Sequence, residues 1–279
     1  MVINHVINNN VVSAYDKDQN EIIVMGKGIG FQKKPGQEIP ENKIEKRFIL
    51  ENKAQVNQFK QLMESVPMNH LAVSVDIIEY AKQVMPKRIS QTIYLSLTDH
   101  INFALERSKE GMLFQNSLLN EVKSFYPSEY LVGEYALALI RRETGIELPI
   151  DEAASIALHF VNAEYNVGMN DTMNITSLIK DTIQIVEDAL QIKLDDMGLY
   201  YSRFVTHLKF LSQRVFTGQL LDNQDQELVE MISRLYPHEY EISKLVGNDI
   251  KEKYDREVTN EELVYLTVHI RRIQPGITE

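Results

Sequence analysis

The chain has 279 residues, of which 44% are hydrophobic and 25% are charged, as in an ordinary globular protein. This length allows two domains, or three small ones. The absence of cysteine excludes disulfides, thiolate catalysis and Cys-type zinc sites. No segment approaches the roughly 18 consecutive apolar residues of a membrane span. The N-terminal MVINHVINNN also lacks the basic and apolar regions of a secretion signal. We therefore expect a cytoplasmic protein without stable membrane insertion.

The net charge of −11 argues against generic nucleic-acid binding, but the charge is unevenly distributed. Residues 1–55 hold eight Lys/Arg and seven Asp/Glu, a net charge of +1, which leaves −12 for the remainder. A near-neutral N-terminal part joined to an acidic body can hide a nucleic-acid surface that the whole-chain charge conceals.

The N-terminal part has the pattern of a small β unit. Short segments rich in Val and Ile, separated by turn sequences such as DKDQN and GKGIG, predict strands at VINHVIN (2–8), VVSAY (11–15), EIIVM (21–25) and KRFIL (46–50). From about Lys53 the apolar residues recur with a helical period, which predicts helices to the end of the chain. The polar ENKAQVNQ at this transition (51–58) fits either a linker or the start of a helix.

The helical part contains an internal repeat. FALER (103–107) aligns with FLSQR (210–214) at an offset of 107 residues, which pairs His100 with His207. FYPSEY (125–130) aligns with LYPHEY (235–240) at an offset of 110. At the same offset, PIDEAASIALHF (149–160) aligns with TNEELVYLTVHI (259–270) and pairs His159 with His269. An insertion near TGQLLDNQ accounts for the change of offset. The repeat predicts two copies of one helical domain, divided near NVGMND (166–171).

The expected fold is therefore multidomain, with a small antiparallel β domain followed by two homologous all-α helical-bundle domains. We place the β domain at residues 1–55, a linker at 56–64, the first helical domain at 65–170 and the second at 171–279.

Four of the seven histidines occupy matching positions in the two copies: His100, His159, His207 and His269. A histidine on an apolar helix face is more often a hydrogen-bonded core residue than a reactive one, and duplication preserves core residues too. Two details favour function. The apolar residues around the histidines differ between the copies, and polar residues adjoin the histidines, such as Asp99 and Thr206.

Several chemistries lack their motifs in this sequence. The sequence contains neither a His-x-x-x-His pair nor a His-Asp doublet, which are motifs of metal sites. Their absence disfavours a helical metal-dependent phosphohydrolase. The GxSxG motif of serine hydrolases is missing, and GKGIG is too short for a dinucleotide-binding loop. We expect neither a metal nor a cofactor. Imidazole, however, can act as a nucleophile and carry a phosphoryl group without either.

Seven stretches, in order and spacing, carry a resemblance to a known family: VINNNVV, MGKGIGFQKKPG, KIEKRF, SLTDHINFALER, IALHFVNAE, RFVTHLKF and LTVHI. The chain resembles the BglG/SacY family of transcription antiterminators, and in particular its LicT-like members, over its whole length. The resemblance implies an N-terminal RNA-binding domain that works as a dimer, followed by two regulatory domains of the phosphotransferase system.

The resemblance also implies that the four matched histidines are phosphorylated. His100 and His159 would be the sites of the first regulatory domain, which answers to a sugar-specific enzyme II permease and inhibits. His207 and His269 would be the sites of the second domain, which accepts phosphoryl groups from HPr and activates. Which donor uses which histidine varies among members. Each added phosphoryl group brings roughly −1.5 to −2 charges, for which arginines such as Arg107 and Arg214 are candidate partners.

In the β domain, the resemblance assigns RNA contacts to Asn10, Gly26, Phe31 and Gln32, and we add Lys27 and Lys33 as phosphate contacts. An amide can read base edges, and Phe31 could stack on a base or pack in the core. Lys27 stands where LicT-like members carry Arg, and a lysine does not reproduce a bidentate guanidinium contact. A domain of this size barely buries enough surface to fold alone, which favours a homodimer.

We therefore expect a non-enzymatic antiterminator that stabilises an alternative hairpin in the leader mRNA of a sugar-utilisation operon. Its expected partners are that mRNA, HPr, the enzyme II permease and a second copy of the chain, but not DNA. Overall likeness favours a β-glucoside as the inducing sugar. The alternative is a DNA-binding transcription activator with the same regulatory domains, which the N-terminal strand pattern opposes.

Overall fold

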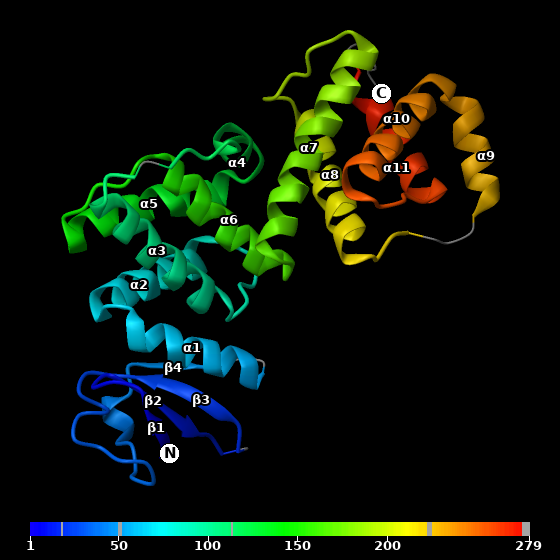
Figure 1. The fold of residues 1–279 in the computed structure, drawn as a ribbon. Coiled ribbons are helices and arrows are strands. Elements are labelled where there is room, and N and C mark those ends of the chain that lie inside the picture. The colour runs from blue at the N-terminus through cyan, green and yellow to red at the C-terminus, as the bar shows by residue number, and fades with distance from the viewer. Residues whose placement is uncertain (18, 50–51, 113, 222–224, 275–279) are drawn as a thin grey trace. The chain divides into compact units, whose positions relative to one another are not determined.

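The computed structural model describes residues 1–17, 19–49, 52–112, 114–221 and 225–274. The chain divides into two compact units, which are described separately (Figure 1). The first contains Met1–Leu119 and Tyr126–Asn166, and the second contains Asn120–Phe125 and Val167–Glu279. Within the described ranges, no helix has the length and apolar character needed to cross a membrane.

The first unit begins with an antiparallel sheet whose strands follow the chain order β1-β2-β3-β4. These are β1 (Val2–Val6), β2 (Val11–Tyr15), β3 (Glu21–Met25) and β4 (Lys46–Phe48), with a short 3-10 helix, η1 (Glu41–Lys43), before β4. Each falls within a segment whose Val/Ile content and flanking turns predict a strand, because β-branched side chains fit a pleated, half-buried surface. The predicted β domain is confirmed.

Both faces of the sheet are covered. Since side chains alternate along a strand, β2 directs Val12 and Ala14 to one face, where they pack with Ile29 and Ile39 from the long β3–β4 connection. Val11 points to the other face. There it joins three further buried sheet residues in the larger core that continues into the helices, namely Ile23, Met25 and Phe48.

Helix α1 (Lys53–Ser65) lies against this second face (Figure 1). It starts at Asn52, whose side chain accepts a hydrogen bond from the Gln55 backbone N–H at 3.0 Å, an ordinary N-cap. Its buried residues include Phe59, whose ring lies 4.9 Å from that of Phe48. The predicted linker, residues 56–64, lies inside this helix. Of the ENKAQVNQ segment, residues 52–58 are thus the N-cap and the start of a helix, and Glu51 lies outside the described residues.

The remaining helices form two successive sets in the same order. The first copy consists of α2 (Met68–Val84), α3 (Ile93–Lys109), α4 (Leu119–Phe125), α5 (Pro127–Thr144) and α6 (Asp151–Tyr165). The second consists of α7 (Met169–Leu190), α8 (Leu199–Thr217), α9 (Gln226–Leu235), α10 (Pro237–Tyr254) and α11 (Asn260–Ile273). The boundary predicted at 170/171 falls in the first turn of α7. The compact units divide at 166/167, and the second unit also includes Asn120–Phe125, so α4 follows the first copy in sequence but not in this division. The predicted fold class of a β domain followed by two homologous helical domains is confirmed.

Local sequence explains why the copies share helix boundaries. Pro127 and Pro237 stand in the first turns of α5 and α10, where the missing N–H of proline has no helical partner to lose. Both helices end at a left-handed residue, Gly145 with φ 73° and Asp255 with φ 53°. The aligned YPSEY and YPHEY segments therefore open equivalent helices.

Candidate functional site

The first histidine pair lies between α3 and α6. The rings of His100 and His159 are 4.7 Å apart between centroids and tilted by 44°. Ile101 beside His100 and Phe160 beside His159 are fully buried, so the packing of the two helices fixes the pair. Burial, and then the neighbouring His100, lowers the pKa of His159 well below its usual value. His159 is therefore neutral at physiological pH.

The second pair repeats this arrangement between α8 and α11. The rings of His207 and His269 stack with 4.1 Å between centroids and 23° between planes. Burial, followed by the nearby His269 and Arg214, lowers the pKa of His207 to about 3. Burial and Arg272 lower the pKa of His269. A neutral imidazole has a free lone pair, which is the form that can attack phosphorus.

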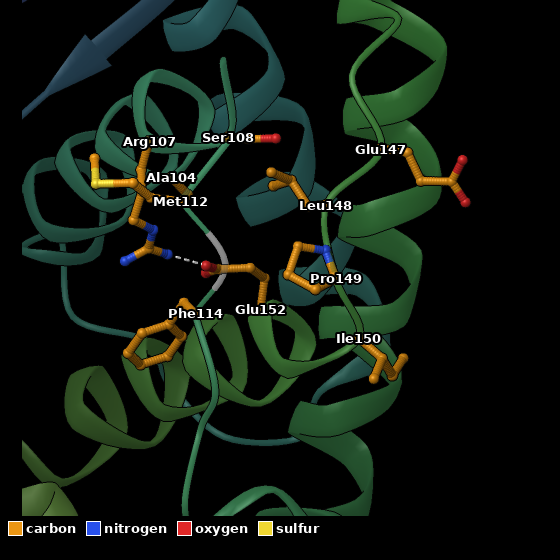
Figure 2. A pocket seen from close by; sticks show the side chains of 10 residues that line it. All are labelled: Ala104, Arg107, Ser108, Met112, Phe114, Glu147, Leu148, Pro149, Ile150 and Glu152. Carbon is orange, nitrogen blue, oxygen red and sulfur yellow. Dashed lines mark hydrogen bonds and ion pairs between the residues drawn. The ribbon is translucent and has the colours of Figure 1, made fainter. Parts of the chain in front are cut away.

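A buried glutamate links the first histidine pair to an arginine. Glu152 is 1% exposed and accepts a hydrogen bond from Arg107 on one carboxylate oxygen. Its other oxygen, Oε2, lies 3.0 Å from Nε2 of His100. The Arg107–Glu152 pair lines a pocket of about 370 Å³ (Figure 2). The centroid of the Phe114 ring, also in this wall, lies 4.7 Å from the guanidinium carbon of Arg107.

The second copy has the same pair with different geometry. Glu262 is fully buried and accepts bonds from Nε and Nη2 of Arg214, both at 2.6 Å. The backbone N–H of Leu221 also donates to Oε1 of Glu262, at 3.0 Å. Nε2 of His207 is buried without a hydrogen-bond partner among the described residues. The two arginines were predicted from the sequence but the glutamates were not, although Glu152 and Glu262 align in the internal repeat.

The predicted RNA-contacting residues meet where β1 and β2 join next to the end of β3. Asn10 accepts a hydrogen bond from the Gly28 N–H on its side chain at 2.7 Å, and one from the Gly26 N–H on its backbone at 3.0 Å. A Cβ on Gly26 would lie 1.9 Å from the carbonyl oxygen of Lys43, so only glycine fits there. Asn10 and Gly26 therefore shape this loop.

The loop after β3 carries the other predicted RNA contacts, Lys27 and the consecutive residues Phe31, Gln32 and Lys33. Phe31 is 57% exposed, which excludes the core alternative and leaves its ring available for stacking. Lys27 and Gln32 are also exposed, whereas Lys33 is half-buried. In the same polar run as Asn10, the side-chain amide of Asn8 donates to the carbonyl of Met63 near the end of α1, at 3.0 Å. RNA contact by these residues stays a prediction.

Comparison with known proteins agrees with this organisation. Residues 1–57 match the CAT RNA binding domain, and residues 75–163 and 180–273 match the PRD domain. The transcription antiterminator LicT of Bacillus subtilis is 43% identical over 273 residues, covering 98% of this chain and 99% of that protein. The Beta-glucoside operon antiterminator of Dickeya chrysanthemi is 36% identical over 279 residues, covering 100% and 99%.

A solved structure supports the same assignment for the first part of the chain. The crystal structure of GlcT CAT-PRDI superposes with a TM-score of 0.53 at 34% identity, covering 58% of this chain and 97% of that one. The predicted family resemblance is confirmed: this chain belongs to the transcription antiterminators that combine an N-terminal CAT RNA binding domain with two PRD domains.

Proposed function

We propose that the chain acts in the cytoplasm as a non-enzymatic homodimer that stabilises an antiterminator hairpin in the leader mRNA of a sugar-utilisation operon. Family membership and the exposed loop around Phe31 support RNA as the target. A relative 36% identical over the full length carries the name Beta-glucoside operon antiterminator, which supports a β-glucoside as the inducing sugar.

Control is proposed to run through histidine phosphorylation. His207 and His269 accept phosphoryl groups from HPr, which activates the protein. His100 and His159 accept them from the sugar-specific enzyme II permease, which inhibits it. One observation carries this proposal: in each copy, the centroids of two imidazole rings lie within 5 Å of each other, beside an arginine that pairs with a buried glutamate. Core packing alone does not require two rings and an ion pair in both copies.

The switch follows from charge. A phosphoryl group adds roughly −1.5 to −2 charges and three acceptor oxygens. Arg107 and Arg214 stand on the helices that carry His100 and His207, and each is held by a glutamate. A phosphoryl group therefore competes with Glu152 or Glu262 for the arginine, and the packing of α3 on α6 or of α8 on α11 responds.

Reporter assays in cells test the signs of the two domains. His100→Ala should make antitermination independent of the inducing sugar, because the inhibitory signal has lost an acceptor. His207→Asp with His269→Asp should restore part of the activity in cells lacking HPr, and the matched Ala pair should be folded but inactive. Constitutive inactivity of His100→Ala, or an unfolded Ala pair with no gain from the Asp pair, would contradict this assignment.

RNA binding can be tested at Asn10 with a pair of variants. Asn10→Asp keeps an oxygen to accept from the Gly28 N–H but loses the amide donor, whereas Asn10→Ala loses both. If the amide reads a base, both variants lose the preference for the cognate over a scrambled hairpin. If Asn10 only shapes the loop, the added negative charge of Asn10→Asp weakens binding to both RNAs by the same factor, and the preference is kept. Lys33→Ala should weaken binding to both RNAs and reduce its salt dependence.

A further inference from the structure

The bond between Glu152 and His100 distinguishes the two copies. A carboxylate only accepts hydrogen bonds, so Oε2 of Glu152 requires a proton on Nε2 of His100, 3.0 Å away. A neutral imidazole carries one proton, which leaves the lone pair on Nδ1. Nδ1 of His100 forms no hydrogen bond with any residue that the structure describes, and the side chain is 17% exposed.

We propose that Glu152 is a positioning residue that fixes the tautomer of His100 and presents Nδ1, rather than Nε2, to the phosphoryl donor. This inference rests on the proposed phosphorylation of His100 and names the atom that accepts the group. Arg107 contributes by holding the other oxygen of Glu152, so that the carboxylate cannot turn away from the ring.

The second copy lacks this device for a geometric reason. Arg107 contacts Glu152 through Nη2 alone, on Oε1, and leaves Oε2 for the histidine. Arg214 instead uses Nε and Nη2 on both oxygens of Glu262, and the Leu221 N–H adds a third bond. Glu262 therefore binds Arg214 and the backbone at Leu221, and it does not fix the orientation of the His207 ring.

The transfer step balances with this tautomer. The Nδ1 lone pair of His100 attacks the phosphorus of a phosphohistidine donor, and the N–P bond of the donor breaks as the new one forms. The donor imidazole leaves neutral with its own N–H. The His100 ring becomes a phosphoimidazolium, whose positive charge is shared by the Nε2–H group that faces the Glu152 carboxylate. The glutamate therefore stabilises charge that develops during transfer.

The tautomer can be measured before any phosphorylation. We would label the full-length chain with ring-¹⁵N histidine and assign His100 by its loss in His100→Gln. The expected spectrum shows a protonated Nε2 and an unprotonated Nδ1 for His100. An Nδ1–H tautomer in the wild-type protein would overturn the proposal, whatever the outcome of phosphorylation.

Glu152→Gln tests the role of the carboxylate. Arg107 needs an acceptor, so the amide oxygen should turn to Arg107 and the NH₂ group to Nε2 of His100. That arrangement moves the ring proton to Nδ1 and removes the nucleophile. We expect the switched tautomer and a rate of His100 phosphorylation lowered by roughly 10- to 100-fold, as for other groups that orient a functional imidazole.

Glu262→Gln is the matched control, because Glu262 bonds no histidine among the described residues. Its His207 and His269 signals should be unchanged. With phosphorylated enzyme II as donor, the wild-type product should be Nδ1-phosphohistidine at His100. Phosphate on Nε2 of His100, or a Glu152→Gln variant with wild-type tautomer and rate, would overturn the role of Glu152. If His100 takes up no phosphate at all while the tautomers behave as stated, the proposed phosphorylation fails and the positioning by Glu152 stands.

Discussion

The two helical copies solve the same packing problem with different residues. In the first copy, Gly133 of α5 lies against the α6 backbone, where a Cβ would come within 2.1 Å of the Ala153 carbonyl oxygen. The equivalent position in the second copy is Ser243, whose hydroxyl lies 2.9 Å from that of Thr267 on α11. A close backbone contact in one copy is thus a buried polar contact in the other.

A compensating change accompanies this difference. Ala153 and Leu137 of the first copy align with Leu263 and Gly247 of the second, so the large and the small side chain have exchanged helices. Total core volume is roughly kept, which is what close-packed interiors require. The histidines, the arginine and the glutamate did not exchange or vary. The packing residues differ between the copies, whereas the histidines, the arginine and the glutamate are the same in both. This difference favours a functional role for the polar cluster over a role in packing alone.

The largest expected effect comes from removing a buried carboxylate. Glu262→Ala leaves the Arg214 guanidinium and the Leu221 N–H without their acceptor, which should lower the free energy of unfolding by about 3–5 kcal/mol. Glu152→Ala should cost less, because its arginine makes one bond and is not forked. Urea unfolding of the full chain measures both.

Glu241→Ala serves as the control for these variants. Glu241 pairs with Lys244 at the exposed surface of α10, and such a pair contributes less than about 1 kcal/mol. Equal small losses for Glu262→Ala and Glu241→Ala would show that the buried pair is not a structural element of the second copy.

The next largest effect tests two helix glycines, Gly133 of α5 and Gly247 of α10. Gly133→Ala places a methyl group against the Ala153 backbone, which must shift, so we expect a loss of about 1–3 kcal/mol. Gly247→Ala meets only the tip of the Leu263 side chain, at 3.2 Å, and gains helix propensity of up to about 1 kcal/mol. Thermal unfolding should therefore separate the two variants in opposite directions. A Gly133→Ala variant as stable as Gly247→Ala would refute the close approach of α5 and α6.

Much of this comparison was predictable from the sequence, because its signals are local. Val/Ile-rich segments between turns predict the strands, and the aligned motifs predict two homologous helical domains with His100 opposite His207 and His159 opposite His269. The sequence at the start of α1 was ambiguous, because Asn52 and the polar residues after it fit a linker as well as the start of a helix. What decides for a helix is the burial of Phe59 against the sheet, a contact between distant residues.

The details of the site were not predictable, because they depend on side-chain geometry. Glu152 and Glu262 align perfectly, yet only one of them bonds a histidine, and this depends on how each arginine approaches. Base reading by Asn10 stays a prediction, and the sequence did not show that its side-chain oxygen accepts a hydrogen bond from the Gly28 N–H. The sequence tells which chemical groups the site contains. Which atoms of these groups form hydrogen bonds depends on side-chain packing, which the sequence does not show.

A further effect concerns pH and the second histidine pair. Folding lowers the pKa of His207 from its usual value near 6.5 to about 3, so the unfolded chain binds a proton that the folded chain does not. Stability should therefore fall as pH drops from 7 towards 4, by at most about 1.4 kcal/mol per pH unit from this residue. His207→Gln should flatten this slope, while His238→Gln at an exposed position of α10 should not. Identical slopes in wild type and His207→Gln, measured by urea unfolding, would argue against a buried neutral imidazole.

The smallest effect distinguishes the copies at a second buried carboxylate. Glu164 of α6 lies near Glu129 of α5, and the aligned pair in the second copy is Gln274 and Glu239, joined by a 3.0 Å hydrogen bond from the amide. Burial, together with Glu129, raises the pKa of Glu164 although Lys87 donates to it at 2.6 Å. A carboxyl group with a raised pKa stabilises the fold below pH 4 and loses that contribution as pH rises through the folded pKa.

Glu164→Gln should therefore make the first copy resemble the second and raise its stability at pH 7 by on the order of 1 kcal/mol. The gain should disappear near pH 4, where the carboxyl group is protonated in both folded and unfolded chains. Gln274→Glu is the reverse control and should destabilise the second copy at pH 7, because it removes the amide donor and places a second carboxylate beside Glu239. If Glu164→Gln instead destabilises the protein at pH 7, the Lys87–Glu164 ion pair outweighs burial and repulsion from Glu129, and the two copies differ here by a stabilising ion pair.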